Sequence, residues 1–412
     1  MKLYKSVIYL ILILVSASCA NDEHAPIIPG SANVSGTLPV MYIDTEHNRP
    51  ITSKTEYINA SYRIEGSADG NFEAIGSATN PEPMQIRGRG HSSWKGNKKP
   101  YKIKLETSTG LLGMAANKHW ALLKPSESSI AGFQLGKLLG MDRTPSIRPV
   151  EVVLNGDYIG LYFLTETIRI GKNRVDIYKQ EDGETNTDLI SGGWLVEIDN
   201  YTDESQIVVP ENGSWLMNIR YHSPKNLSPI QSTWLKTEFK AINSAIYSNS
   251  TDWERYIDIE SMARFFILQE VMDNPDGFHG SFYLHKDLGE GCKWVAGPAW
   301  DLSCYFRKKT DYTFRLPVHY QITPHWIGKL IEYDDFCRSV NEVWSEVYPG
   351  RLNEIYNYID ETISPLEAAW ANDCTRWGED PTQSAGVRAE RIKKYLRSNM
   401  EWLDRNLPKG KK

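Results

Sequence analysis

The chain has 412 residues, of which 41% are hydrophobic and 24% charged, so it is long enough for one large domain or two smaller ones. The formal net charge of -6 excludes the basic composition typical of nucleic-acid-binding domains, and nucleic acid is not expected as a partner. The 13 Trp and 22 Tyr residues suit stacking on sugars, but such residues more often fill a core, and an aromatic-rich core is the favoured interpretation.

The N-terminal residues have the pattern of a secretion signal. Two lysines precede an apolar run over residues 7–15, which is too short to span a bilayer stably. Cys19 follows a group of small residues, as at a lipoprotein processing site, which predicts a signal peptide over residues 1–18 and a lipid on Cys19. The alternative is an ordinary signal peptide with a chance cysteine. Residues 19–37 are small, polar and contain Pro and Gly, which predicts a flexible tether.

The acidic residues directly after Cys19 resemble the surface-export signals of some Gram-negative lipoproteins. We therefore expect an exported protein that its lipid anchors in the bacterial envelope, at the outer membrane or cell surface. Two disulfides and four free thiols are equally compatible with the remaining cysteines. These cysteines are Cys292, Cys304, Cys337 and Cys374.

Residues 38–210 are predicted to be mostly β-sheet. Turn residues and period-two alternation predict strands over 39–44, 57–64, 84–87, 101–105, 120–124, 149–154, 158–165 and 192–199. A helix is expected over 128–139. Within 101–105 the apolar residues alternate with Lys102 and Lys104, so both lysines are expected on one face of the strand.

Residues 211–412 are predicted to be mainly helical. Apolar spacing predicts helices over 234–247, 256–272, 335–347, 351–370 and 385–407, with a short hairpin formed by 281–285 and 293–296. A β-rich part followed by a helical part predicts an α+β fold with two lobes, and ligands commonly bind in a cleft between lobes. The basic residues of the last helix, including Arg388 and Arg391, are interpreted as a solvated face.

A basic, glycine-rich stretch lies at residues 86–105, with the sequence IRGRGHSSWKGNKKPYKIKL. It contains seven Lys and Arg residues and no Asp or Glu. Glycines let backbone N–H groups approach a phosphate, and Lys and Arg supply the countercharge, so the stretch indicates an anion site. A hairpin with a solvated, salt-bridged face is the equally weighted alternative.

Acidic and amide residues gather in two places of the helical part. Asn274 and Asp276 flank Pro275, which is expected to end the preceding helix, and Asp301 follows a predicted strand and a Gly-Pro turn. Two carboxylates and an amide oxygen suit Mg²⁺, and with the basic stretch they make half of a phosphoryl-transfer site. The alternative is that these are ordinary helix-end and turn residues.

Five segments occur in an order that resembles the spore-coat protein H (CotH) kinase-like family. They are IRGRGHSSWKGNKKPYKIKL, LNGDYIGLYFLTETIRIGKNRVDI, GGWLVEID, DNPDG and GPAWDLS, and the resemblance covers roughly residues 38–350. It implies an atypical protein-kinase-like, two-lobed fold that uses ATP with a divalent metal, Mg²⁺ or Mn²⁺. It also implies phosphorylation of Ser residues on protein substrates.

The resemblance also implies roles for residues of the first two segments. Arg87, Gly88, Arg89 and Gly90 would lie over the nucleotide phosphates. Either Lys102 or Lys104 would contact the phosphates, and the sequence does not choose between them. Glu166 would pair with that lysine, or it is a plain strand-end residue.

In the last two segments Asp276 would orient or deprotonate the substrate hydroxyl, with Asn274 nearby. Asp301 would hold the metal, with Asn274 as a second ligand. The family commonly reads Trp-Asp-Phe-Asp where this chain reads Trp-Asp-Leu-Ser, so Ser303 replaces the second Asp. A hydroxyl is a weaker metal ligand than a carboxylate, which puts the second metal contact in doubt.

The sequence therefore favours a metal-dependent phosphotransferase that moves phosphate from ATP to Ser or Thr of envelope proteins. The alternative is a non-catalytic surface lipoprotein that binds a protein or a glycan. This alternative is retained because ATP is scarce outside the cytoplasm. A glycan hydrolase built on Asp276 and Asp301 is less favoured, because it needs no basic phosphate wall.

Overall fold

The structure is a computed structural model that describes residues 34–67, 70–141, 143–199, 207–208, 211–212, 215–216, 218–274, 276–278, 280–304, 306, 326–380 and 382–411. The predicted signal peptide, Cys19 and most of the predicted tether lie outside these residues. Residues 32–412 form one compact unit, which contains all the elements of the fold.

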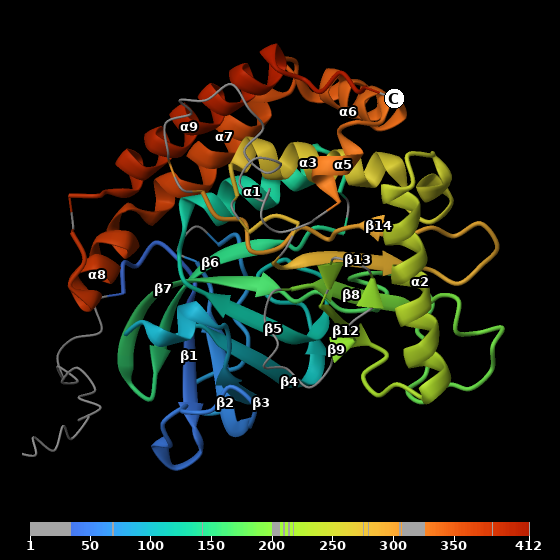
Figure 1. Ribbon diagram of the computed structural model, residues 1–412. Helices are drawn as coiled ribbons and strands as arrows, with labels where there is room; N and C mark the ends of the chain where they lie inside the picture. Colours follow the sequence, from blue (N-terminus) through green and yellow to red (C-terminus); the bar gives the residue numbers. More distant parts are fainter. Residues whose placement is uncertain are drawn as a thin grey trace, which may run out of the picture. The chain divides into compact units, whose positions relative to one another are not determined.

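Seven strands close into a barrel in the order β1-β2-β3-β4-β5-β7-β6 (Figure 1). They are β1 (Val40–Thr45), β2 (Ile58–Glu65), β3 (Glu82–Gly88), β4 (Tyr101–Thr109), β5 (Asn117–Leu123), β6 (Ile147–Leu154) and β7 (Asp157–Glu166). Neighbours are antiparallel except β1 and β6, which pair in parallel and close the barrel. Alternate residues such as Ile86, Ile103 and Trp120 are completely buried and fill the interior, as the period of two requires.

The basic stretch forms the β3–β4 hairpin, and its register decides which cations lie together. Arg87 pairs with Lys102, and Lys104 pairs with His119 of β5. Because Ile86 and Ile103 point inward, these alternating polar residues lie on the outer face of the barrel. The predicted shared face of Lys102 and Lys104 is confirmed.

A second sheet has the order β14-β13-β8-β12-β9. Its strands are β8 (Trp194–Ile198), β9 (Ile207–Val208), β12 (Ile219–Ser223), β13 (Phe282–Lys286) and β14 (Val295–Ala296), and β10 (Glu211–Asn212) and β11 (Trp215–Leu216) form a separate pair. Helix α2 (Pro229–Tyr247) lies beside this sheet (Figure 1). The Trp234 ring of α2 stacks on the Trp194 ring of β8, with 5.5 Å between the ring centres. The helix begins earlier than predicted because Ser228 and Gln231 form a capping box ahead of the apolar positions.

The remaining helices are α1 (Glu127–Leu138), α3 (Ile259–Met272), α5 (Ile327–Leu330), α6 (Asp334–Val347), α7 (Leu352–Ile363), α8 (Glu367–Trp377) and α9 (Ala385–Arg405). Helix α9 packs on α1, α3 and α7 (Figure 1). The single helix predicted over 351–370 is wrong: α7 ends at Ile363, and Pro365 lies in a 3-10 turn before α8. Proline lacks the N–H that would continue the helix.

The structure confirms a mixed α+β protein with a β-rich first part and a helical last part. The closed barrel was not predicted, and the second sheet takes β8 from before residue 210 and β12, β13 and β14 from after it. All four described cysteines are free thiols.

Aromatic residues mainly fill the core. Completely buried tryptophans include Trp120, Trp194, Trp253, Trp294 and Trp326. Among the large exposed hydrophobic side chains of the described residues, Tyr247 is the one aromatic. Within the same residues, no helix combines the length and apolar character needed to cross a bilayer.

Candidate functional site

A cavity of about 700 Å³ lies between the outer face of the barrel strands and the second sheet. Its lining includes seven cationic side chains and two carboxylates. The cations are Arg87, Lys102, Lys104, Arg169, Lys179, Arg220 and Lys225, and the acids are Glu181 and Asp182. The volume is typical of small-molecule sites, which range over roughly 300–1,000 Å³. A cavity of this size and charge is suited to a small polyanion.

Lys102 is the most perturbed cation of this cavity. Burial lowers the pKa of its amine to about 7, and the neighbouring guanidinium groups of Arg87 and Arg169 contribute to that decrease. Burial and the same positive surroundings lower the pKa of the nearby His119 to about 3, so that imidazole is neutral at pH 7. An anion in the cavity would supply the countercharge that Lys102 lacks.

The opposite wall carries a buried carboxylate. Glu197 of β8 is 3% exposed, and its register neighbours are Arg220 of β12 and Tyr283 of β13. The His222 Nε2 atom lies 2.7 Å from the Glu197 Oε2 atom, and the two rings of His222 and Tyr283 stack at 5.3 Å. Burial raises the pKa of Glu197, but His222 and Arg220 outweigh it and hold the pKa below its ordinary value. Glu197 therefore stays ionised and orients His222 in the cavity wall.

Arg89 connects the cavity to the acidic residues. Its guanidinium lies 5.2 Å from the centre of the Trp300 ring. Burial lowers the pKa of Arg89, while Asp301 and Glu197 raise it and Arg87 lowers it, so these charges are within electrostatic reach of one another. Arg89 is thus within electrostatic range of both Arg87, which lines the cavity, and Asp301.

Asn274 joins the two acidic loops. Helix α3 ends at Met272, and the C-cap residue Asp273 takes a left-handed conformation with φ of 50°. The buried Asn274 donates from Nδ2 to the Asp301 carbonyl at 3.3 Å and accepts at Oδ1 from the Asp276 N–H at 3.3 Å. It also donates to Gln269 of α3 at 2.8 Å. One side chain therefore fixes the backbone of both acids.

Asp276 and Asp301 both reach solvent. The protein atoms packed around the Asp301 carboxyl nevertheless raise its pKa, Arg89 opposes this, and the negative charge of Asp276 adds to it. Two carboxylates whose negative charges disfavour each other can both be stabilised by a cation between them.

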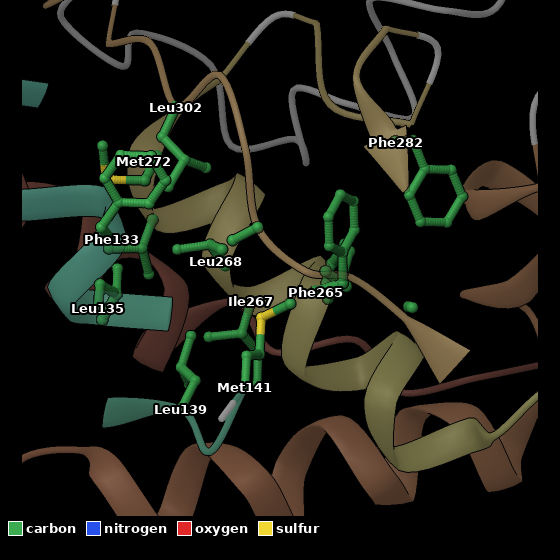
Figure 2. Close-up of a cluster of buried hydrophobic side chains, with 14 of the residues drawn as sticks. Phe133, Leu135, Leu139, Met141, Phe265, Ile267, Leu268, Met272, Phe282 and Leu302 are labelled. Atoms are coloured by element: carbon green, nitrogen blue, oxygen red, sulfur yellow. The ribbon is translucent and has the colours of Figure 1, made fainter. Parts of the chain in front are cut away.

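Leu302 anchors Asp301 from the core. It is 3% exposed and lies among the side chains of α1 and α3, near Phe133 and Met272 (Figure 2). Gly132 of α1 makes room for it, because a Cβ at that position would lie 2.6 Å from the Leu302 Cβ. The loop at Asp301 is therefore held by the packing of Leu302 as well as by the hydrogen bond from Asn274.

The residues present fit a hard divalent cation. Mg²⁺ in proteins is commonly held by one or two carboxylates, and phosphate oxygens and water complete its coordination. Asp276 and Asp301 can provide the carboxylates. The described residues contain no group of three or more His, Cys, Asp or Glu side chains arranged to hold a metal by themselves. The Asn274 Oδ1 atom already accepts a hydrogen bond, so one lone pair remains for the predicted ligand role.

Several predicted residues lie elsewhere. Glu166 pairs with Arg174 at 2.7 Å and accepts from the Ser146 N–H, in place of a pair with Lys102 or Lys104. The reason is the barrel register: Glu166 lies opposite Trp120, whose row points inward, whereas both lysines point outward.

Gly88 and Gly90 of the basic stretch have structural roles in the β3–β4 hairpin. A Cβ on Gly88 would overlap the Trp94 ring, and Gly90 has φ of 85°, which favours glycine. The cavity lining includes neither glycine. Lys98, from the same stretch, is buried against Asp373 of α8.

Sequence reasoning missed the wall formed by Glu197, Arg220 and His222. Two signals were present: Glu197 interrupts an apolar strand, and Arg220 and His222 alternate at the period of a strand.

The comparison with protein families identifies the class. The family model described as CotH kinase protein matches residues 86–403, and the chain belongs to that family. It is a kinase-like protein. A search of the curated proteins finds no match. The crystal structure of the Helicobacter pylori proinflammatory kinase CtkA matches at 13% sequence identity and a TM-score of 0.28, over 74% of this chain and 94% of that chain. The family assignment rests on the family match alone.

Proposed function

We propose that this protein is a metal-dependent phosphotransferase that moves the γ-phosphate of ATP to Ser or Thr of an envelope protein. The observation that carries the proposal is the cationic cavity, which Arg89 connects to the acidic pair Asp276 and Asp301. Phosphoryl transfer needs little covalent chemistry from the protein, and mainly needs cations on the phosphates and a carboxylate at the nucleophile.

The proposal includes a two-lobed kinase arrangement. The strands before residue 210 supply the phosphate wall through Arg87 and Lys102, and the loops after it supply Asp276 and Asp301. Arg89 would neutralise charge on the transferred group, because it is within electrostatic range of both Arg87 and Asp301.

In the proposed reaction the substrate hydroxyl oxygen forms a bond to the γ-phosphorus, and the bond from that phosphorus to the β–γ bridging oxygen breaks. Asp276 accepts the hydroxyl proton, for which its solvent-open position on the loop after α3 is suitable. Asp301 would hold Mg²⁺ or Mn²⁺, which neutralises phosphate charge when bound. The cations of the cavity keep the leaving diphosphate in place.

Cellular location forms part of the proposal. The pattern around Cys19 supports a lipid anchor and a place in the bacterial envelope, where the substrate would be another envelope protein. Mass spectrometry of the N-terminal peptide from cells would reveal the lipid, and Cys19→Ser should release the protein from the membrane fraction.

Two measurements test the activity. Thermal unfolding with ATP and Mg²⁺ or Mn²⁺ should show stabilisation of roughly 2.7 kcal/mol at a hundredfold the dissociation constant. Incubation with labelled ATP and envelope protein should give labelled Ser or Thr, and Asp301→Ala should abolish it. Absence of stabilisation by any nucleotide would sink the proposal, and transfer that survives Asp301→Ala would remove Asp301 from the metal site.

A further inference from the structure

We propose that helix α9 positions the two acidic loops of the site, and that Tyr395 is the positioning residue through which it acts. The inference rests on the proposed function for its catalytic consequence. Its structural content, that α9 restrains both loops, can be tested without any activity.

The first contact joins α9 to the end of α3. The Tyr395 hydroxyl donates to the Asp273 Oδ2 atom at 2.6 Å, and the Asn399 Nδ2 atom donates to the Val271 carbonyl at 2.8 Å. All four residues are buried. A hydroxyl bound to a carboxylate away from water is among the stronger hydrogen bonds of a protein. The last turn of α3 is therefore fixed by residues from two successive turns of α9.

This contact lies one residue from the site. Asp273 directly precedes Asn274, whose side chain holds the backbone of both Asp276 and Asp301. Asp273 also takes the left-handed conformation that turns the chain out of the helix. A side chain that holds this residue thereby sets the direction in which Asn274 leaves α3.

The second contact reaches the segment after Asp301. The Phe306 ring lies 5.1 Å from the Tyr395 ring, and the Arg391 guanidinium lies 4.6 Å from the centre of the Phe306 ring. Tyr395 therefore contacts Asp273 on the N-terminal side of the first acidic loop and Phe306 on the C-terminal side of the second. Its two contacts span the acidic pair.

The helix itself is well anchored. Ile392, Leu396 and Leu403 are completely buried, and Arg391 and Arg388 both pair with the buried Glu127 of α1. The predicted solvated face holds for the exposed Lys394 and Arg397, whereas Arg388 and Arg391 also pair with a buried carboxylate. A helix fixed on α1 and α3 is rigid enough to define the position of a loop.

Hydrogen exchange of the full chain tests the restraint directly. Tyr395→Phe keeps the ring against Phe306 and removes the bond to Asp273. In peptides covering 273–280 and 301–306 we expect amide exchange to be at least about tenfold faster than in the wild-type protein. The reason is that the lost hydrogen bond to a charged group opposes local opening. Peptides of the barrel strands should not change.

Tyr356→Phe is the matched control. Tyr356 on α7 has a buried hydroxyl without a hydrogen-bond partner, and Arg397 of α9 lies over its ring. The variant removes the same atom from a tyrosine beside the same helix, and exchange in both loops should equal that of the wild-type protein. Asp273→Asn keeps an acceptor for the hydroxyl and should show a smaller effect than Tyr395→Phe.

Catalysis supplies the second readout. In Tyr395→Phe we expect kcat to fall roughly tenfold, with KM for ATP within about twofold, since the cavity is built by other elements. Unchanged exchange in both loops would overturn the inference. A wild-type protein without transfer would sink the proposed function, while exchange would still decide the role of Tyr395.

Discussion

Lys102 and Lys98 lie four residues apart in the same basic stretch, and their replacement by methionine is expected to have opposite effects. Lys102 faces the cavity, among arginines. Lys98 is buried against Asp373 and donates to the Leu161 carbonyl. Methionine has a similar length and no charge, so each variant removes one cation with little change in packing.

Lys98→Met should destabilise the fold and leave ligand affinity unchanged. It leaves Asp373 buried at 3% exposure, and of the two donors that reach its side chain from the described residues the Leu161 N–H remains. Removing one member of a buried ion pair typically costs about 3–5 kcal/mol of unfolding free energy. The measurement is the free energy of unfolding in urea at pH 7.

Lys102→Met should stabilise the protein and weaken anion binding. The pKa of Lys102 falls from its ordinary value of 10.5 to about 7 in the fold. Between these values the unfolded chain binds the proton that the folded protein lacks, so stability rises with pH from about 7 to 10.5. Removing this poorly solvated cation should stabilise by roughly 1–3 kcal/mol near neutral pH.

The same pKa makes nucleotide binding depend on pH. A phosphate beside Lys102 restores its proton, so binding takes up a proton above pH 7. Affinity should weaken about 20-fold from pH 6.5 to 8.5 if the bound lysine returns to its ordinary pKa.

Titration calorimetry with a non-hydrolysable ATP analogue, in two buffers of different ionisation enthalpy, counts the protons. Wild-type protein should take up one more proton than Lys102→Met at pH 8.5, and the titration of the nucleotide itself cancels in this difference. Equal proton uptake in both proteins, or equal loss of affinity in Lys98→Met and Lys102→Met, would refute the assignment of Lys102 to the anion site.

Three further predictions concern the rest of the site. Gly132→Ala should displace Leu302 and lower kcat several-fold at unchanged ATP affinity, measured by steady-state kinetics beside calorimetry. Glu197→Leu should release His222 and weaken ATP binding about tenfold, and a Kd equal to wild type would contradict the role of Glu197 as the residue that orients this wall. Removal of divalent metal with EDTA should abolish transfer of label but leave ATP binding detectable, because the cavity cations already meet the phosphates.

The sequence predicted the β3–β4 hairpin and the faces of its lysines because alternation is a local property of a strand. It also predicted Asn274, Asp276 and Asp301 as a group, and the structure joins the loops of all three. The first result depends on residues that are close in sequence, and the second depends on the order of motifs in the CotH kinase-like family.

The features that the sequence did not predict depend on long-range pairing. Glu166 could not be placed from its own strand, since closure of the barrel puts it beside Trp120 and away from Lys102. Lys98 meets Asp373 across 275 positions of sequence, and Tyr395 meets Asp273 across 122. No periodicity within a single segment carries such information, so only packing in three dimensions separates a cavity cation from a structural one.

Ser303 is best interpreted from the contacts around it. A second Asp at this position would have two possible uses, to brace the loop or to bind metal. Bracing is already provided here, because Asn274 holds the Asp301 carbonyl and Leu302 is buried between α1 and α3 (Figure 2). Replacing the Asp by Ser therefore removes a charge and leaves the loop in place. The replacement should therefore weaken metal binding, because the Asp276 and Asp301 carboxylates would hold the metal without a third carboxylate at position 303. Ser303→Asp should accordingly lower the metal concentration needed for transfer, while loop exchange and ATP affinity stay as in the wild-type protein.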